Sequence, residues 1–327
     1  MVKCILITGG AGYAGYTITE ELSSKFPDYK IVIFDNFSKG KLEGIGLLAQ
    51  NHKNIEIIPW EKADIRDNEN VENAFEQYKP EIVVHLAAIV DAFTTNREGK
   101  DRECEIVNYN SAVSVAKIAK KHGCKIFIFQ CTVSIYSRGE ELTEDSPKEP
   151  LSTYGKSKMK AEIEILELND EKLKVVSLRP ATIVGYNPCF RYETIINLAC
   201  IRAVYKVPIN IFESALKGEK TFLTLKDNAK AIIFSIENIE KMKGNTFNIT
   251  SYHANLENVL TKIKENLKEE FPYFITPQKS ISQQVYTINS DKIKKIGFKP
   301  EGTLEETINE TVSSLKNVKE FYKKFNN

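Results

Sequence analysis

The sequence predicts an α/β protein with a doubly wound parallel sheet, followed by a smaller C-terminal α/β unit. Short apolar runs without polar alternation, such as Cys4–Ile7, are typical of strands that are buried on both faces of a parallel sheet. These runs alternate with helical patterns through the first half of the chain. The first run leads directly into the glycine-rich segment Thr8–Gly15, after which a helical pattern begins.

The segment Thr8–Gly15 (TGGAGYAG) has the glycine spacing of a dinucleotide-binding turn. Gly9 permits the tight turn, Gly12 lets the backbone approach a pyrophosphate, and Gly15 lets the helix pack close to the strand. The N-terminus of the helix offers unpaired N–H groups and a partial positive charge to the phosphates. We therefore expect a dinucleotide to bind here.

An acidic residue follows the second predicted strand, Lys30–Phe34. Asp35 lies about 20 residues after the last glycine, where a ribose-binding carboxylate is expected. Such a side chain accepts hydrogen bonds from the ribose hydroxyls and repels a 2′-phosphate. We therefore expect NAD as the cofactor, while Lys39 and Lys41 leave NADP as the alternative.

The alternation of strands and helices continues in order along the chain. Further strands are expected at 55–58, 81–88, 125–129 and 173–178, and helices at 41–50, 68–78, 101–122 and 154–168. Asp67 or Asn68 is expected to cap the second of these helices, and Gly123 to close the third.

After residue 180 the alternation is less regular. Helices are expected at 192–205, 227–239, 256–267 and from 304 onward, and short strands at 222–225 and 246–249. We therefore divide the chain into a Rossmann-type dinucleotide-binding unit, residues 1–180 plus about 226–250, and a substrate unit, residues 181–225 plus 251–327.

Composition excludes several classes of function. The 327 residues include 45 basic and 44 acidic side chains, so no global field favours nucleic acid or an anionic membrane as partner. No apolar run approaches the roughly 20 residues of a membrane-spanning helix, and the first strand leaves no room for a signal peptide. The six cysteines show no CxxC pair and the four histidines are scattered, so no metal site is expected. These features predict a cytoplasmic protein.

A tyrosine and a lysine occur four residues apart in a predicted helix, and they therefore share one face. A free tyrosine titrates at about 10, but the ammonium of Lys158 would lower the pKa of Tyr154 towards the working range of a base. Tyr154 could then exchange a proton with a sugar or alcohol hydroxyl; the same pair also fits a solvated helix face. Thr132 follows the strand 125–129 and could bond the reacting oxygen, with Ser134 as the alternative.

Five motifs appear in the order and spacing of the extended short-chain dehydrogenase/reductases, a family that includes nucleotide-sugar epimerases, dehydratases and reductases. They are TGGAGYAG at Thr8–Gly15, FDN at Phe34–Asn36, DIRD at Asp64–Asp67, HLAA at His85–Ala88 and YGKSK at Tyr154–Lys158. The segment 296–307 also resembles the usual ending of the family, so the likeness spans nearly the whole chain. The chain thus resembles an NAD-dependent nucleotide-sugar enzyme.

The resemblance implies a catalytic set of Thr132, Tyr154 and Lys158, in which Lys158 also holds the nicotinamide ribose. The cofactor contacts that it implies are Gly9, Gly12, Tyr13, Ala14, Gly15, Asp35, Asn36, Asp64, Ile65, Leu86, Ala87, Ala88, Tyr154 and Lys158. Asn108 is counted with them because it matches a position that supports the backbone of the active site. The expected substrate contacts are Thr132, Ser134, Thr182, Arg191, Asn197 and Lys220.

The chain departs from the family at informative places. Val133 and Ser134 stand where dehydratases carry an Asp-Glu pair, and neither can serve as that acid or base, so a 4,6-dehydratase is not expected. Thr182 replaces an asparagine of many epimerases. Lys220 and Thr224 replace an arginine and a histidine of the substrate site. A lysine meets a diphosphate without a bidentate fork, which Arg191 with Asn197 could supply instead.

We expect an NAD-dependent enzyme that acts on C4 of a nucleoside-diphosphate sugar by hydride transfer, with epimerisation as the leading interpretation. The alternatives are a 4-keto-sugar reductase or 4-dehydrogenase, and a non-catalytic NAD-binding regulatory protein. The helices Asp101–His122 and Ser152–Leu168 carry more apolar residues than one packing face requires. They therefore predict a homodimer, unless other parts of the same chain cover them.

Overall fold

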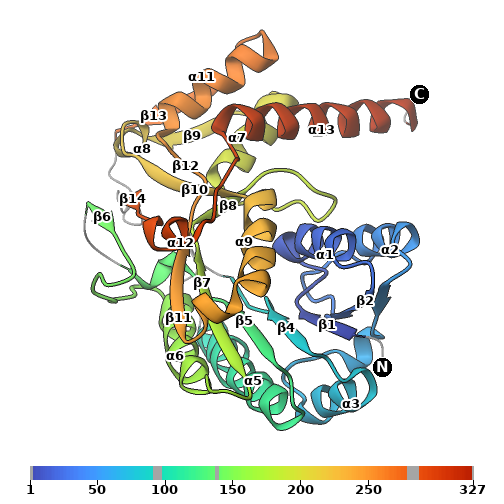
Figure 1. Cartoon of the computed structure of the whole chain (residues 1–327). Coiled ribbons are helices and arrows are strands. Elements are labelled where there is room, and N and C mark those ends of the chain that lie inside the picture. Colours follow the sequence, from blue (N-terminus) through green and yellow to red (C-terminus); the bar gives the residue numbers. More distant parts are fainter. Residues whose placement is uncertain (1–2, 91–97, 137–139, 278–286, 326–327) are drawn as a thin grey trace.

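The computed structural model describes residues 3–90, 98–136, 140–277 and 287–325. A seven-stranded parallel sheet forms its centre, in the order β11-β7-β5-β4-β1-β2-β3 (Figure 1). Its strands are β1 (Lys3–Thr8), β2 (Tyr29–Phe34), β3 (Ile55–Ile57), β4 (Ile82–His85), β5 (Ile126–Gln130), β7 (Lys174–Pro180) and β11 (Asn245–Ile249). The predicted doubly wound sheet is confirmed. Its strand order reverses between β1 and β4, which opens a ligand crevice at their carboxyl ends.

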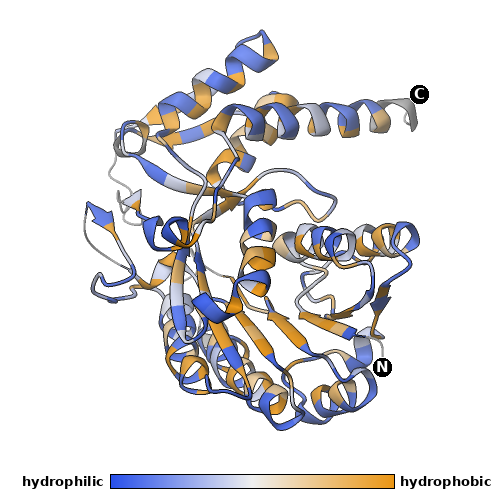
Figure 2. Ribbon diagram, viewed as in Figure 1, coloured by the Kyte–Doolittle hydropathy of each residue, from blue (hydrophilic) through white to orange (hydrophobic). Residues whose placement is uncertain are grey.

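Helices cover both faces of this sheet (Figure 1). One face packs on α1 (Tyr13–Lys25), α2 (Leu42–Asn51) and α9 (Leu225–Glu237), and the other on α3 (Asn68–Tyr78), α5 (Ala112–Lys121) and α6 (Thr153–Glu167). Successive strand residues point to opposite faces, so Ile5 and Ile7 join one core while Cys4 and Leu6 join the other. Figure 2 accordingly shows the central strands as largely hydrophobic along their length.

The helix expected at 101–122 is present, and its middle part is π-helical. It runs through α4 (Glu98–Cys104), a π-helical segment η2 (Glu105–Ser111) and α5 without a break, since Cys104, Ser111 and Ala112 all have right-handed helical dihedral angles. A π-helical turn is wider than an α-helical turn and is frequent at functional sites. Here it contains Asn108, whose amide accepts a hydrogen bond from the Ile89 N–H at 2.7 Å and donates to the Ile89 carbonyl at 2.9 Å. The prediction of a helix is therefore confirmed, and the π-helical segment within it was not predicted.

The later part of the chain has a core of its own, formed by residues between 184 and 315. Its strands are β8 (Thr182–Val184), β9 (Ile209–Phe212), β10 (Lys220–Thr224), β12 (Tyr252–Ala254) and β13 (Tyr273–Thr276); its helices are α7 (Ile195–Tyr205), α8 (Glu213–Leu216), α11 (Leu256–Leu267) and α13 (Leu304–Phe325). The remaining elements are α10 (Ile239–Met242), α12 (Asp291–Ile296), η1 (Trp60–Lys62), η3 (Val133–Ile135), β6 (Glu141–Leu142) and β14 (Thr287–Ile288). Ile293 and Phe298 pack into the core of the first unit, although the sequence division placed them in the second.

The apolar surplus expected on α5 is buried inside the chain. Val115 and Ala116 are fully buried, and they share a core with Phe75 of α3 and Ile165 of α6. Packing within one chain therefore accounts for these residues, so the argument for a homodimer from an uncovered α5 face was wrong. On α6, Ile163 is 49% exposed.

Substituting Val115→Glu should therefore unfold the protein and not merely separate subunits. An unpaired charge in this core should lower the free energy of unfolding by more than about 3 kcal/mol, as measured by denaturant titration. Lys117→Glu changes an exposed residue of the same helix and should have little effect. A folded, monomeric Val115→Glu variant with unchanged stability would instead place Val115 at a subunit contact.

Candidate active site

The glycine-rich turn leaves space where phosphates are expected. Gly9 has φ +72°, and a Cβ added to it would lie 2.6 Å from the Ala87 nitrogen. A Cβ added to Gly15 would lie 2.3 Å from the Gly9 carbonyl oxygen, so neither position accepts a side chain. A Cβ at Gly12 would meet only that same oxygen within 4 Å, at 3.3 Å, and no side chain caps the N-terminus of α1. The turn therefore has room for a pyrophosphate, whose oxygens could accept hydrogen bonds from the free N–H groups at the start of α1.

Asp35 lies directly beside this turn at the end of β2. Its carboxylate accepts hydrogen bonds from the backbone N–H groups of Ala11 at 3.0 Å and Phe37 at 2.8 Å. Burial raises the pKa of Asp35, and these two hydrogen bonds oppose the shift. The oxygens retain lone pairs that could accept ribose hydroxyls. The Lys41 ammonium, a potential partner of a 2′-phosphate, donates instead to the carbonyl of Phe190 at 3.5 Å.

A second polar group follows β3. Asn36 donates to the Asp64 carboxylate at 3.1 Å. Hydrogen bonds from Arg66 lower the pKa of Asp64 to about 2, although partial burial opposes the shift. Ile65 is only 6% exposed and packs in the core, so only its backbone is left for a cofactor.

The segment Leu86–Ala88 runs beside the glycine turn after β4. The Leu86 N–H donates to the Thr8 carbonyl at 3.0 Å, and the Ala87 N–H donates to the Thr8 hydroxyl at 3.4 Å. Asn108 holds the next residue of this segment and also donates to Ser157 of α6 at 3.3 Å. Since Asn108 is fully buried, it lies behind the cofactor contacts and supports them.

Tyr154 meets Thr132 where α6 begins against the segment that follows β5. The Ser152 hydroxyl caps α6, and a Cβ added to Gly155 would lie 2.4 Å from the Ser134 carbonyl oxygen. Tyr154 is 8% exposed, and its phenol lies near enough to the Thr132 side chain for that side chain to favour the phenolate; the Thr132 hydroxyl accepts from the Ser134 N–H at 3.1 Å. The start of the helix thus places the phenol beside the threonine.

The pKa values of Tyr154 and Lys158 respond mainly to burial. Burial raises the pKa of Tyr154 to about 12, while the Thr132 side chain and the positive charge of Arg191 oppose the shift. The lowering of this pKa by the Lys158 ammonium together with a bound nicotinamide stays a prediction. Burial also lowers the pKa of Lys158 to about 8.

The Lys158 ammonium has no hydrogen-bond partner within the described residues. Its side chain is 1% exposed and its Nζ lies 4.2 Å from the centre of the Phe129 ring. A buried ammonium without an acceptor is costly. Hydroxyl groups of a bound ribose would supply acceptors, and this orphan group together with the open turn at Gly12 fits a dinucleotide.

Two predicted ligand residues instead link the two units of the chain. Asn197 is fully buried; it accepts from the Gly185 N–H at 3.0 Å and donates to the Tyr13 hydroxyl at 3.0 Å and the Arg191 carbonyl at 2.7 Å. The Tyr13 hydroxyl donates to the Gly185 carbonyl at 2.6 Å. The amide of Asn197 is thus used inside the protein, where it positions Arg191, and is not free for a substrate.

The remaining predicted substrate residues lie on the second unit. Thr182 is exposed at the start of β8. Lys220 is partly buried at the start of β10; burial lowers its pKa, and no acceptor pairs with it within the described ranges. Arg191 is paired with Glu193 at 3.5 Å. Thr224 caps α9 by accepting from the Asp227 N–H, so it is committed to the fold.

The sequence analysis missed a buried charged network behind α6, in which Glu162 pairs with Arg179. The signals were an arginine at the end of an apolar strand and a glutamate one helical turn after Lys158. Neither signal identifies its partner.

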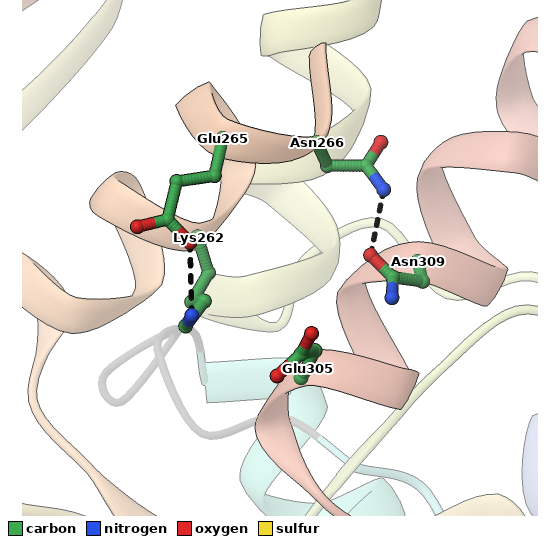
Figure 3. A pocket seen from close by; sticks show the side chains of 5 residues that line it. All are labelled: Lys262, Glu265, Asn266, Glu305 and Asn309. Carbon is green, nitrogen blue, oxygen red and sulfur yellow. Dashed lines mark hydrogen bonds and ion pairs between the residues drawn. The ribbon is translucent and has the colours of Figure 1, made fainter. Parts of the chain in front are cut away.

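A groove of about 150 Å³ lies between α11 and α13, away from all predicted site residues (Figure 3). Across it, Asn266 of α11 donates to Asn309 of α13 at 2.6 Å, while Lys262 pairs with Glu265 within α11 at 2.8 Å. None of the residues that line this groove is a predicted site residue. Within the residues described, no three His, Cys, Asp or Glu side chains gather as metal ligands, and no helix is both long and apolar enough to cross a bilayer.

The parallel sheet with its switch point, the glycine turn and the buried Tyr154–Lys158 pair define a dinucleotide-dependent α/β enzyme. The sequence model of the NAD dependent epimerase/dehydratase family matches residues 5–250, and the chain belongs to this family. It is therefore an enzyme whose cofactor is NAD.

Individual relatives include both activities named by the family. The UDP-glucose 4-epimerase 2 of Arabidopsis thaliana is 28% identical over 198 residues, or 58% of this chain and 54% of that protein. The dTDP-D-glucose 4,6-dehydratase of Mus musculus is 28% identical over 332 residues, or 95% of this chain and 88% of that protein. The chain thus spans only about half the length of the plant epimerase that it matches.

A solved structure supports the fold. The UDP-glucose 4-epimerase of Thermus thermophilus, in complex with NAD, superimposes with a TM-score of 0.80 at 22% identity, over 96% of this chain and 99% of that chain.

The position of Asp35 predicts tighter binding of NAD than of NADP. The carboxylate repels a 2′-phosphate, so the dissociation constant of NADP, measured by calorimetry, should exceed that of NAD by at least about tenfold. Asp35→Asn should bring the two dissociation constants closer together. Lys41→Ala should leave their ratio unchanged, because the Lys41 ammonium donates to the Phe190 carbonyl. Tighter binding of NADP by the wild type would contradict this assignment.

The buried Lys158 predicts a pH-dependent stability in the absence of cofactor. Its pKa is about 8 in the folded protein, against an ordinary value of 10.5 for a lysine, so the unfolded state binds more protons between these values and stability should rise with pH there. Lys158→Met should therefore stabilise the protein at pH 7, and this gain should shrink as the pH rises from about 8 to 10.5. Thermal melts over this range measure the effect. A destabilised variant at pH 7 would show that the ammonium has a partner in the folded chain.

Proposed function

We propose that the protein is an NAD-dependent epimerase that acts on C4 of a nucleoside-diphosphate sugar. The observation that carries this proposal is the Tyr154 hydroxyl, which is buried, lies beside the Thr132 side chain and is one helical turn from the unpartnered Lys158 ammonium. A hydroxyl proton can be exchanged at this place, next to a turn that fits a dinucleotide.

Each residue has a distinct part in this proposal. The glycine turn and Asp35 hold the pyrophosphate and a ribose, and Lys158 donates hydrogen bonds to the other ribose. NAD, when bound, supplies a hydride acceptor and a positive ring charge. Tyr154 takes the proton of the sugar hydroxyl as a phenolate and returns it to the same oxygen, and Thr132 orients that oxygen. In an epimerase the keto sugar rotates within the site, and it is then reduced on its other face.

The second unit offers cationic groups for the diphosphate of the substrate. Lys220 is partly buried and unpaired in the described chain, and Arg191 carries a charge that reaches Tyr154. A lysine and an arginine together suit a phosphate group. Thr182, exposed at the start of β8, is the expected contact to the sugar or nucleotide.

The site does not support dehydration, although one relative is named a 4,6-dehydratase. Elimination of water requires a further acid and base beside the threonine. Val133 is 9% exposed and packs in the core. The next residue, Ser134, has no acidic side chain. A net reductase or dehydrogenase would use the same residues as the epimerase, and a regulatory protein would need only the cofactor contacts.

One assay separates these functions. The purified protein is incubated with NAD and a panel of nucleoside-diphosphate sugars, while absorbance follows NADH and NMR follows the sugar. A C4 epimer without net NADH supports the proposal. Accumulating NADH would indicate a dehydrogenase, and cofactor binding without any turnover would indicate a regulatory protein.

Tyr154→Phe should lower turnover at least about 100-fold, because it removes the general acid/base. The fold and the dissociation constant of NAD should not change, since the phenyl ring keeps its packing. Tyr205→Phe changes a partly exposed tyrosine at the end of α7 and serves as the control. Near-normal turnover of the Tyr154→Phe variant would overturn the mechanism.

For assembly we propose a homodimer that forms around the exposed face of α6. Ile163 is a half-exposed apolar side chain there, and it lies among charged residues that could form the rim of a contact. Light scattering at micromolar concentration should show a dimer for the wild type and a monomer for Ile163→Glu. A monomeric wild type would refute this proposal. All six cysteines are buried and none of them forms a disulfide, which supports a reducing compartment such as the cytoplasm.

A further inference from the structure

An ion pair is buried behind the candidate site, between α6 and β7. The side chains of Glu162 and Arg179 are 2% and 1% exposed. Arg179 Nη2 donates to one carboxylate oxygen at 2.5 Å, and Nε lies 2.9 and 3.1 Å from the two oxygens. Ser177 donates to the same carboxylate at 2.6 Å. The pair is therefore bidentate and fully hydrogen-bonded, as a buried charge requires.

The other edge of the guanidinium reaches a different element. Arg179 Nη1 donates to the Tyr136 hydroxyl at 2.5 Å and to the Glu144 carbonyl at 3.3 Å. The Tyr136 hydroxyl in turn donates to Asn248 of β11 at 2.9 Å. Because guanidinium donors lie in one rigid plane, Arg179 fixes these partners at a set distance from Glu162.

The two partners of Arg179 lie on the two segments that meet at the site. Tyr136 ends the short helix η3, whose N-cap is Thr132. Glu162 follows Lys158 by one turn of α6 and Tyr154 by two turns. Arg179 thus bridges the segment of the threonine and the helix of the tyrosine. The start of α6 lies against the first segment, because a Cβ added to Gly155 would lie 2.4 Å from the Ser134 carbonyl oxygen. The placement of Tyr154 beside Thr132 therefore depends on how these two segments are held.

Stability alone does not require a charged pair here. The desolvation of two buried charges offsets much of their attraction, so an apolar pair of similar volume can hold a fold equally well. An apolar contact, however, tolerates small rotations and shifts that a planar, bidentate pair does not.

We propose that Glu162 and Arg179 are positioning residues that set the Tyr154 phenol against the Thr132 segment for proton transfer. This inference rests on the proposed function of Tyr154. It assigns a role to two residues that contact neither the cofactor nor the substrate.

The test replaces the pair by the apolar double substitution Glu162→Leu/Arg179→Met. The melting temperature, the dissociation constant of NAD and the KM for the sugar should stay close to wild type, while kcat falls at least about tenfold. The Thr132 side chain lowers the pKa of Tyr154, so a shift of Tyr154 away from it should raise that pKa. In the pH profile of kcat, the rise that accompanies formation of the phenolate should therefore move to higher pH.

Two further variants separate positioning from bulk stability. Arg179→Lys keeps the charge but cannot form the bidentate pair with the carboxylate, so its kcat should also be low. This variant tests the proposal if the double variant does not fold. Lys226→Met/Glu310→Leu removes an ion pair whose side chains are 64% and 60% exposed, and should change nothing. Wild-type kcat and an unshifted pH profile in the folded pair variants would overturn the proposal.

A readout without substrate distinguishes this inference from the proposed function. In protein labelled with 3-fluorotyrosine, the fluorine resonance of Tyr154 is assigned by its absence from Tyr154→Phe. The proposal expects that resonance to move in the pair variants and to stay unchanged in the surface control. An unmoved resonance would refute the positioning role, whereas a wild type inactive on every sugar would refute only the proposed function.

Discussion

The candidate site depends on one close approach, between the start of helix α6 and the backbone that follows β5. The absence of a side chain at Gly155 lets the helix lie against the Ser134 carbonyl, which an added Cβ would meet at 2.4 Å. This contact brings the Tyr154 hydroxyl beside the Thr132 side chain. The ion pair of Glu162 with Arg179 holds the same two segments from behind. The proposed proton transfer thus rests on the packing of a helix against a strand end.

Burial is the second constraint, and it acts on both titratable groups of the site. The tyrosine is held neutral and the Lys158 ammonium is left without a partner, so the protein alone is poised for a ligand that brings charge and acceptors. The glycine turn after β1, two strands away from β5 in the sheet, leaves room for such a ligand, and Asp35 lies beside that turn. Family membership identifies the ligand as NAD.

Much of the fold and part of the site follow from local sequence signals. The buried strands, the Asp67 cap and the helix 256–267 are encoded within a few residues, and the structure contains them. Interactions between distant residues could not be inferred this way. Asn197 bonds a tyrosine hydroxyl 184 positions away, and Arg179 bonds Tyr136 43 positions away. The π-helical turn at Asn108 likewise depends on a partner, the backbone of Ile89, which no helical periodicity contains.

The central claim is that hydrogen leaves C4 of the sugar as hydride and returns to the same carbon. The most direct test follows deuterium at C4 of a labelled nucleoside-diphosphate sugar by NMR while the protein turns it over with NAD. The account predicts that the C4 epimer keeps its deuterium at C4 and that none is exchanged with water. Loss of the label to solvent would show that C4 loses a proton instead, and would contradict the account.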